Sequence, residues 1–318
     1  MSRNNTNKVT KKEEFFWELL HTPKNSKRIL DEGQLRRLLA FLAKEYDIEK
    51  YAVPSLLQIK SSAEYGEESE FKIDKKTIII YKNGMKRLKD KYVKDSKKYS
   101  FARMLTPILL GETDISVLDH ECHHAQQVKY LFENCSRGIE YELFRTSYMD
   151  SMIESRNYAA ILDRYYSGSV QTRFGSKYGE LVRQVGDHLI KIGKFCNNDY
   201  SLIDPAEINA DYLTYKGMIT FNKKYYRELS EFWADMLFAH LKRIYKTKNG
   251  QIKCPAETYF IKRNAIVTLD KLYLSDFKSS IKRMPLDKRL SLGLPISKDE
   301  YNGLYDFTHQ HLGSERRK

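Results

Sequence analysis

The chain has no long run of apolar residues. Its two most apolar stretches, residues 104–111 and 77–81, are far shorter than the ~20 residues that a membrane-spanning helix needs. The first residues, MSRNNTNKVTKKEEFF, carry charges where a signal peptide has its apolar segment. We therefore expect a soluble, cytoplasmic protein that makes no membrane contact.

Cysteine is scarce and irregularly placed. Cys122, Cys135, Cys196 and Cys254 form no CxxC pair and lack the spacing of a structural zinc cluster. Reduced, intracellular thiols are the simplest expectation. Cys122 lies between two histidines of the motif described below but on another side of its helix, and we expect it to serve in packing.

Internal repeats and low-complexity linkers are absent, so the sequence marks no sharp domain boundary. A chain of 318 residues with 41% hydrophobic content can bury a sizeable core. The patterns predict an α+β fold that is predominantly helical. We expect N-terminal helices over residues 1–50, a core over 51–220 and a helical C-terminal extension over 221–318.

Apolar periodicity predicts where the helices and strands lie. Helices are expected at residues 12–21, 27–46, 115–131, 139–166, 176–195, 205–220, 224–246 and 257–282. Residues typical of strands indicate β structure at 53–60 and 71–81. Residues 111–114 carry the signs of a helix start, so the helix over 115–131 is expected to begin there.

The net charge is +13, and the densest basic segment spans residues 82–98. Eight lysines and arginines in this segment are opposed by two aspartates, and Tyr81, Tyr92 and Tyr99 are interleaved with them. A solvated helix or loop face explains such a segment without any partner. The functional alternative is a surface for an acidic partner or nucleic acid.

The segment from His120 to His124 reads His-Glu-Cys-His-His, which is an HExxH motif within a helical pattern. Residues four apart lie on one face of a helix, so His120 and His124 direct two imidazoles at one point where a zinc ion can sit. Glu121 flanks that point and is placed to take a proton from water rather than to bind the metal. Because histidine is scarce in this chain, a chance match is a poor explanation.

A catalytic zinc ion normally has three protein ligands, so the motif needs a further one. The candidates are Glu154, Glu207 and Glu231. Helical periodicity places Glu231 and Asp235 opposite an apolar face, toward solvent, whereas Glu207 points inward. Glu207 has an alternative role as a capping residue at the start of its helix, and Glu154 stays open as the alternative third ligand.

The HExxH motif, followed by the Glu-x-x-Ala-Asp run that starts at Glu207, resembles the gluzincin group of zinc metallopeptidases. The resemblance implies a zincin-like core in which His120, His124 and Glu207 bind zinc. It implies that Glu121 activates the water. It further implies that Asp211 holds a ligand histidine through a hydrogen bond.

The same resemblance implies a zinc metalloendopeptidase that hydrolyses peptide bonds in a protein or peptide substrate. The strand that ends at Tyr81 is similar in placement to the edge strand along which such enzymes pair their substrate. A tyrosine or histidine is expected to stabilise the oxyanion. The sequence offers Tyr158, Tyr212 and His188 for that role and does not choose among them.

Two other interpretations fit parts of the sequence. Peptide deformylase carries a similar His-Glu-Cys-x-His motif, but it needs an upstream cysteine ligand, and no cysteine precedes Cys122. The second interpretation is a basic module that binds nucleic acid or a protein and keeps a structural or vestigial zinc site. Residues 82–98 are its main support.

Overall fold

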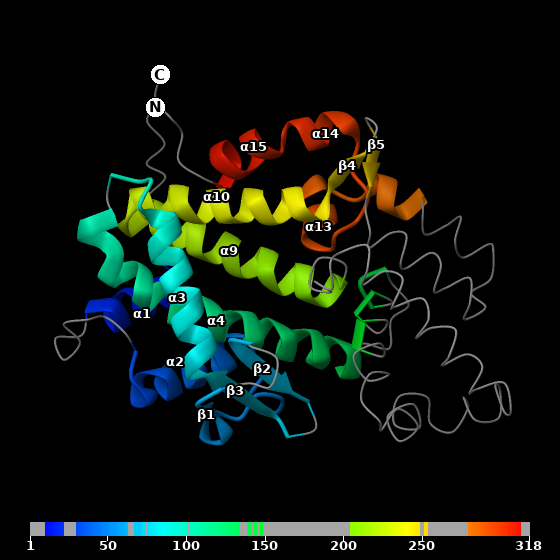
Figure 1. Ribbon diagram of the computed structural model, residues 1–318. Helices are drawn as coiled ribbons and strands as arrows, with labels where there is room; N and C mark the ends of the chain where they lie inside the picture. The colour runs from blue at the N-terminus through cyan, green and yellow to red at the C-terminus, as the bar shows by residue number, and fades with distance from the viewer. Residues whose placement is uncertain are drawn as a thin grey trace, which may run out of the picture. The chain divides into compact units, whose positions relative to one another are not determined.

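Among the residues that the computed structural model describes, the chain is mostly helical with a small three-stranded sheet (Figure 1). This confirms the predicted α+β, predominantly helical class. In the same part of the chain, no helix combines the length and the apolar character that crossing a bilayer requires. The described residues are 10–21, 30–62, 67–73, 75–100, 102–133, 139–141, 143–144, 147–148, 204–248, 251–253 and 279–312.

Several predicted helices cannot be compared with the structure. The helix expected at 176–195 lies outside the described residues, as do most of 139–166 and most of 257–282. Contacts divide the chain into two compact units. The first comprises Met1–Lys129, Leu213–Leu237 and Asp306–Lys318, and the second comprises Tyr130–Tyr212 and Phe238–Tyr305.

Two amphipathic helices open the described part of the first unit. Helix α1 (Lys11–His21) and helix α2 (Glu32–Glu45) each bury one apolar side. The Asp31 side chain accepts a hydrogen bond from the Gln34 backbone N–H, and the Gln34 side chain accepts one from the Asp31 backbone N–H. This capping box explains why α2 begins at Glu32 rather than at the predicted residue 27.

A three-stranded sheet follows the short 3-10 turn η1 (Pro54–Leu56). Strand β3 (Thr77–Tyr81) pairs parallel with β1 (Gln58–Lys60) and antiparallel with β2 (Ser69–Lys72), and all five of its residues are buried. The prediction that the strand ending at Tyr81 is the substrate-pairing edge is therefore wrong, because β3 is bonded on both sides. Among the described strands, β2 is an edge strand with β3 as its one partner.

Helix α3 (Lys82–Ser96) follows β3 without a loop and contains most of the basic segment. Met85 and Tyr92 lie on its buried side. Its first turn approaches the chain that leads into β2 so closely that a Cβ added to Gly84 would lie 2.0 Å from the carbonyl oxygen of Glu67. Glycine is needed at this position because no larger residue fits the contact.

Helix α4 (Ala102–Glu133) carries the HExxH motif. It begins well before residues 111–114, so the predicted helix start is wrong. The polar side chains there are not caps: they are buried in the first unit, and Glu112 and Asp114 have tertiary partners. Glu112 Oε2, for example, accepts a hydrogen bond from Trp233 Nε1 at 2.7 Å. Glu112 precedes an apolar run, and that pattern predicted a helix start. In the structure its carboxylate is instead a buried hydrogen-bond acceptor inside the helix.

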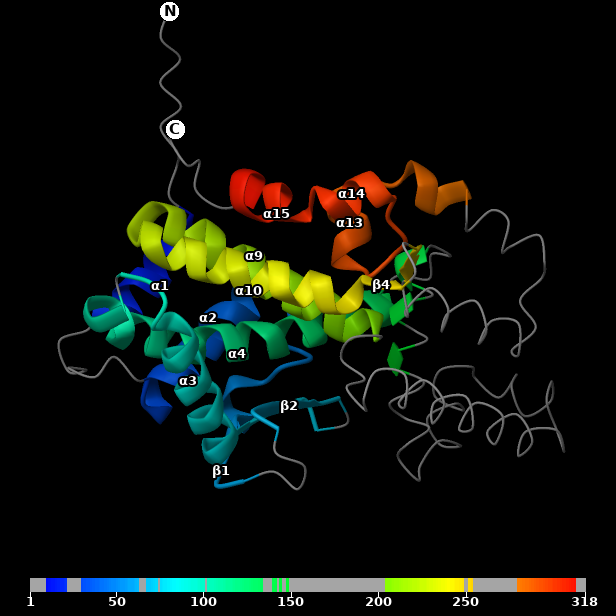
Figure 2. The same ribbon diagram turned by 45° about the horizontal axis from the view of Figure 1, so that its top comes forward.

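Helices α9 (Pro205–Tyr225) and α10 (Arg227–Ile244) are joined at a single residue and lie side by side in both ribbon views (Figures 1 and 2). They confirm the predicted helices at 205–220 and 224–246, with ends shifted by a few residues. In the first unit, α9 packs on α4, since a Cβ added to Gly217 would lie 3.8 Å from Asp119 Oδ2. Helix α9, which begins with the Glu-x-x-Ala-Asp run, is thus in contact with the helix that carries HExxH.

The second unit contains the end of α10 and short elements near the C-terminus. Tyr245 donates a hydrogen bond to the Leu294 carbonyl at 2.8 Å, and Arg289 pairs with Glu300. The short elements are β4 (Lys246–Lys248), β5 (Gln251–Lys253), α13 (Leu286–Ser291), α14 (Lys298–Asn302) and α15 (Leu304–Asp306). The π-helical turn η4 (Phe307–Leu312) follows and belongs to the first unit.

Candidate metal centre

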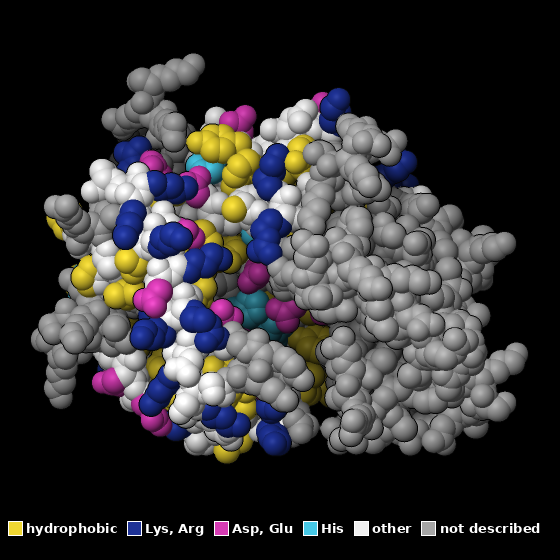
Figure 3. Space-filling model, viewed as in Figure 1, with side chains coloured by type: hydrophobic (Ala, Val, Ile, Leu, Met, Phe, Trp, Pro, Cys, Tyr) yellow, Lys and Arg dark blue, Asp and Glu magenta, His cyan; other side chains and the backbone are white. Residues whose placement is uncertain are grey.

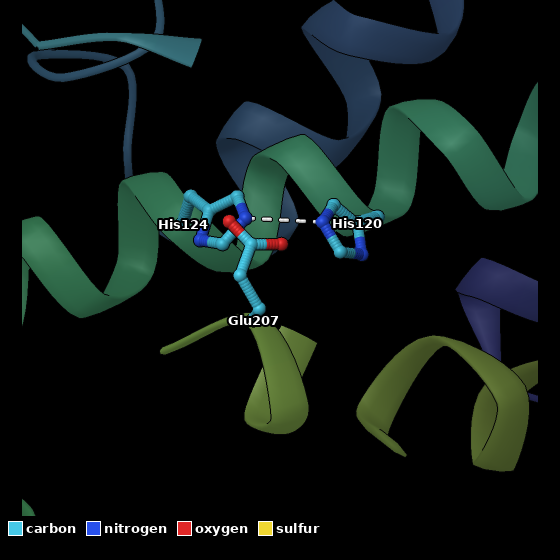
Figure 4. Close-up of side chains that lie close together, drawn as sticks. All are labelled: His120, His124 and Glu207. Atoms are coloured by element: carbon cyan, nitrogen blue, oxygen red, sulfur yellow. Dashed lines mark hydrogen bonds between the residues drawn. The ribbon is translucent and has the colours of Figure 1, made fainter. Parts of the chain in front are cut away.

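His120 and His124 lie one turn apart on α4 and direct their rings at one another (Figure 4). Nε2 of His124 lies 3.0 Å from Nε2 of His120. Two nitrogens that bind one tetrahedral zinc ion at ~2.0–2.1 Å lie about 3.3 Å apart. The two imidazoles therefore have nearly the separation that a shared ion requires.

Gln127 orients one of these imidazoles. Nδ1 of His124 lies 3.1 Å from Oε1 of Gln127 on the next turn of α4. An amide oxygen accepts a hydrogen bond, so Nδ1 carries the ring proton and Nε2 keeps the lone pair that a metal binds. Sequence reasoning missed Gln127, although its i+3 spacing from His124 could have identified it.

Glu207 lies on the first turn of α9, and Figure 4 shows its carboxylate directed toward the two imidazoles. The ligand atoms of His120, His124 and Glu207 all lie within 4.8 Å of one another, and together they can hold a metal ion. Asp204 accepts a hydrogen bond from the Ala206 backbone N–H at 2.8 Å, so Asp204 caps this helix. The Glu207 carboxylate is directed at the histidines instead.

Glu121 is buried beside the histidines on α4. Ser69 Oγ donates a hydrogen bond to Glu121 Oε1 at 2.6 Å, and Ser69 is the first residue of the edge strand β2. This bond fixes the orientation of the carboxylate and joins the sheet to the HExxH helix. No local pattern indicates the contact, because its partners are 52 residues apart in the chain.

A second buried polar cluster lies directly before the motif. Asp119 Oδ1 accepts hydrogen bonds from Lys12 Nζ at 2.9 Å and from Tyr46 OH at 2.6 Å, and His123 Nε2 lies 3.6 Å from Asp119 Oδ2. Burial opposes the charged carboxylate, but the Lys12 and His123 charges outweigh it and hold the pKa of Asp119 below its usual value. His123 is therefore part of this cluster, whereas His120 and His124 belong to the candidate metal group.

The remaining predicted site residues have different outcomes. Asp211 Oδ2 lies 3.6 Å from Nδ1 of His240, a buried histidine of α10 that sequence reasoning did not single out. A role for Asp211 in holding a ligand histidine stays a prediction. Glu154, Tyr158 and His188 lie outside the described residues.

One expectation stays a prediction, and another needs correction. Tyr212 is fully buried and donates a hydrogen bond to Asp287 Oδ1 at 2.6 Å, and burial together with Asp287 raises its pKa. Its hydroxyl is therefore held by Asp287, and its role as one of the three candidate oxyanion stabilisers stays a prediction. Asp235 and Glu231 are half-buried rather than facing solvent. Asp235 accepts hydrogen bonds from residues brought together by the tertiary fold, including His309 at 2.8 Å.

Figure 3 shows histidine side chains recessed in a hollow on one face of the molecule, with acidic side chains next to them. His120 and Glu207 are partly exposed, while His124 is buried. Two of the three candidate ligands are therefore accessible to solvent. Cys122 is a buried free thiol, and burial raises its pKa, as expected for a residue used in packing.

Compared with known family models, curated proteins and solved structures, the chain matches none. Its chemistry must therefore be inferred from the donor groups themselves. Two imidazole nitrogens and one carboxylate are a ligand set typical of catalytic zinc, which keeps a further position for water or substrate. A buried carboxylate next to such a set is placed for proton transfer.

Proposed function

We propose that this protein is a zinc-dependent metallopeptidase in which His120, His124 and Glu207 bind the metal. The observation that carries the proposal is the convergence of their ligand atoms within 4.8 Å, with the two Nε2 atoms 3.0 Å apart. Bound zinc would act as a Lewis acid that polarises the scissile carbonyl and activates water.

Glu121 is the general base in this proposal. Its carboxylate lies on the turn between the two ligand histidines, is shielded from bulk solvent and is held by the Ser69 hydroxyl. It accepts a proton from the attacking water and delivers it to the leaving amine. An ordered, buried carboxylate suits this role because proton transfer requires a fixed distance and direction.

The substrate would bind as an extended chain along β2. This strand has one partner among the described strands, and its first residue contacts the proposed general base. Main-chain hydrogen bonds to an open strand edge bind a peptide with little dependence on its side chains. The sheet, its edge strand and the HExxH helix together support a zincin-like core.

Peptide hydrolysis by the zinc-loaded protein tests the proposal. We expect cleavage of an unfolded protein substrate, detected by mass spectrometry of the products. Glu121→Gln should retain zinc and the fold but lose roughly a hundredfold to ten-thousandfold in turnover, because the amide cannot accept the proton. The matched control is Glu49→Gln, at an exposed residue away from the motif, which should cleave like the parent.

One result would contradict the role of Glu121, and another would contradict the peptidase function. Cleavage by Glu121→Gln at the parental rate would show that another group is the base. A parent protein that holds no zinc and cleaves no peptide would contradict the peptidase function as a whole.

A further inference from the structure

The solvent-facing half of helix α3 carries a set of exposed lysines. We name this set the lysine stripe, and its members are Lys82, Lys86, Lys91, Lys94 and Lys97. Helical periodicity spreads them over the half of α3 that faces away from Met85 and Tyr92, along roughly 22 Å. Asp90 is the one exposed acidic residue among them, in a helix that the structure describes throughout. Figure 3 shows Lys and Arg side chains gathered over this helix. Within the described part of the chain, none of the five makes an ion pair.

Other lysines of the same segment have structural roles. Lys89 is mostly buried and pairs with Asp114 of α4 at 2.5 Å, and Lys98 pairs with Asp235 at 2.9 Å. The fold thus compensates the basic groups that face its own helices and leaves the lysine stripe to solvent. Like charges four residues apart, such as Lys82 and Lys86, repel each other and weaken a helix. An anionic partner would remove that repulsion.

The first end of the lysine stripe lies next to the proposed catalytic residues. Ser69 of β2 pairs with Ile80 of β3, and α3 begins at Lys82, two residues after Ile80. The Ser69 hydroxyl contacts Glu121. The start of α3 therefore lies close to the Ser69 end of β2, where its first turn approaches Glu67.

We propose that the lysine stripe binds an acidic segment of the polypeptide substrate, next to the part that is cleaved. This inference rests on the proposed peptidase function. Alternate side chains of an extended peptide lie about 6.7 Å apart on one side, and Lys82 and Lys86 are about 6 Å apart along the helix axis. Aspartates or glutamates at alternate positions therefore match the spacing of this first lysine pair.

Nucleic acid fits this surface less well. Proteins that bind single strands stack the bases on exposed aromatic side chains. The tyrosines of this segment are not available for stacking: Tyr81 and Tyr92 are 6% and 4% exposed, and Tyr92 packs against Trp233 with ring centroids 5.6 Å apart. Tyr99 donates its hydroxyl to Asp235. The surface offers charge without a platform for bases.

Binding to the inactive Glu121→Gln protein tests the inference without cleavage. The probes are a fluorescein-labelled peptide of alternating Glu and Ser, its counterpart with Gln for Glu, and a single-stranded DNA oligonucleotide of similar length. Fluorescence anisotropy should show that the Glu peptide binds and that the Gln peptide binds at least about tenfold more weakly. Binding should weaken as salt is added, because exposed charges are screened within ~8 Å at physiological ionic strength.

Two triple variants locate the binding surface. Lys82→Gln, Lys86→Gln and Lys94→Gln together remove three charges from the stripe, and we expect about a tenfold loss of affinity for the Glu peptide, since each exposed pair contributes up to about fivefold. The control replaces Lys11, Lys44 and Lys282, which are exposed on other elements. It changes the net charge equally and should leave the affinity within about twofold of the parent.

Equal losses in the two triple variants would overturn the inference, because the effect would then come from net charge alone. Tighter binding of the DNA than of the Glu peptide, lost in the stripe variant, would assign the surface to nucleic acid instead and also overturn it. The peptidase proposal fails by a different result, the absence of zinc and cleavage. Peptide binding in this assay does not depend on turnover.

Discussion

Lys12 Nζ lies 2.9 Å from Asp119 Oδ1, and the carboxylate of Asp119 is completely buried. The ion pair joins the N-terminal helix α1 to the residue directly before the first ligand histidine. The lysine is itself mostly buried and also lies over the ring of Phe16. The HExxH helix is thus anchored to α1 by an ion pair between residues more than a hundred positions apart in the chain.

Removing the lysine charge should destabilise the protein markedly. Lys12→Met keeps the length of the side chain but leaves Asp119 buried without its cation, which typically costs about 3 kcal/mol of unfolding free energy. Urea unfolding of the parent and the variant measures this loss. Lys11→Met, at the exposed neighbouring position, is the control and should change stability by less than about 0.5 kcal/mol. Equal effects of the two substitutions would show that the ion pair contributes nothing.

Local geometry was predictable from the sequence. The positions of His120 and His124 on one side of a helix depend only on the i, i+4 spacing, and the inward direction of Glu207 depends on the apolar period of its own helix. These relationships involve neighbouring turns, so a single sequence contains them.

Tertiary contacts were not predictable in the same way. Asp114 and Glu112 looked like a helix start, yet one pairs with Lys89 and the other with Trp233. The order of the strands made β3 central, although its sequence is equally compatible with an edge. Which side chain meets a buried polar group depends on residues distant in the chain, and a single sequence does not record those pairings.

Zinc binding should depend on the three proposed ligands. His120→Ala, His124→Ala and Glu207→Ala should each remove the metal, because each deletes one of its donor atoms. Elemental analysis of the purified variants measures the zinc content. Glu231→Ala should leave zinc unchanged. If Glu207→Ala retains zinc while Glu154→Ala loses it, the second motif is misassigned and Glu154 is the third ligand.

Residues that orient ligands should have a smaller effect. Gln127→Ala removes the acceptor that fixes the His124 ring, and Asp211→Ala tests the predicted support of a ligand histidine. Loss of such a partner typically weakens zinc binding ~10- to 100-fold without abolishing it. Competition with a chelator of known affinity measures the change. Gln126→Ala, next to Gln127 and in contact with His123 rather than with a ligand, is the control and should bind zinc like the parent.

Glu112 should make stability depend on pH. Its carboxyl group is completely buried, and burial raises its pKa from 4.5 to about 8 despite hydrogen bonds from Trp233 and Asn222. Among the described residues, Glu112 Oε1 and Asn222 Oδ1 are buried acceptors without a hydrogen-bond donor. Burial without enough donors opposes the charged carboxylate, so the folded protein favours neutral Glu112.

The raised pKa of Glu112 should make the protein less stable as the pH rises. Below pH 4.5 the carboxyl is protonated in both states, and its contribution to stability is complete. From there to about pH 8 the unfolded chain releases the proton while the folded protein keeps it, so stability falls by up to about 1.4 kcal/mol per pH unit. Glu112→Gln should be as stable as the parent near pH 5 and more stable near pH 8 by a few kcal/mol. If parent and variant lose stability in parallel over this range, as we expect for the exposed control Glu228→Gln, then Glu112 is not the group that titrates.

Gly84 should determine where the edge strand lies. A Cβ at this position would be 2.0 Å from the Glu67 carbonyl oxygen, so Gly84→Ala must displace the backbone that leads into β2. We expect a loss of roughly 1–3 kcal/mol in unfolding free energy, and lower peptide hydrolysis because Ser69 no longer holds Glu121 in place. The zinc content should remain unchanged, because the proposed ligands lie on α4 and α9.

Gly217→Ala is the matched control. Its Cβ meets only ordinary contacts at 3.8 Å or more, and alanine stabilises a helix interior relative to glycine by about 0.5–1 kcal/mol. The two substitutions should therefore shift the urea midpoint in opposite directions. A Gly84→Ala protein that is as stable and active as the parent would show that the contact with Glu67 does not position β2.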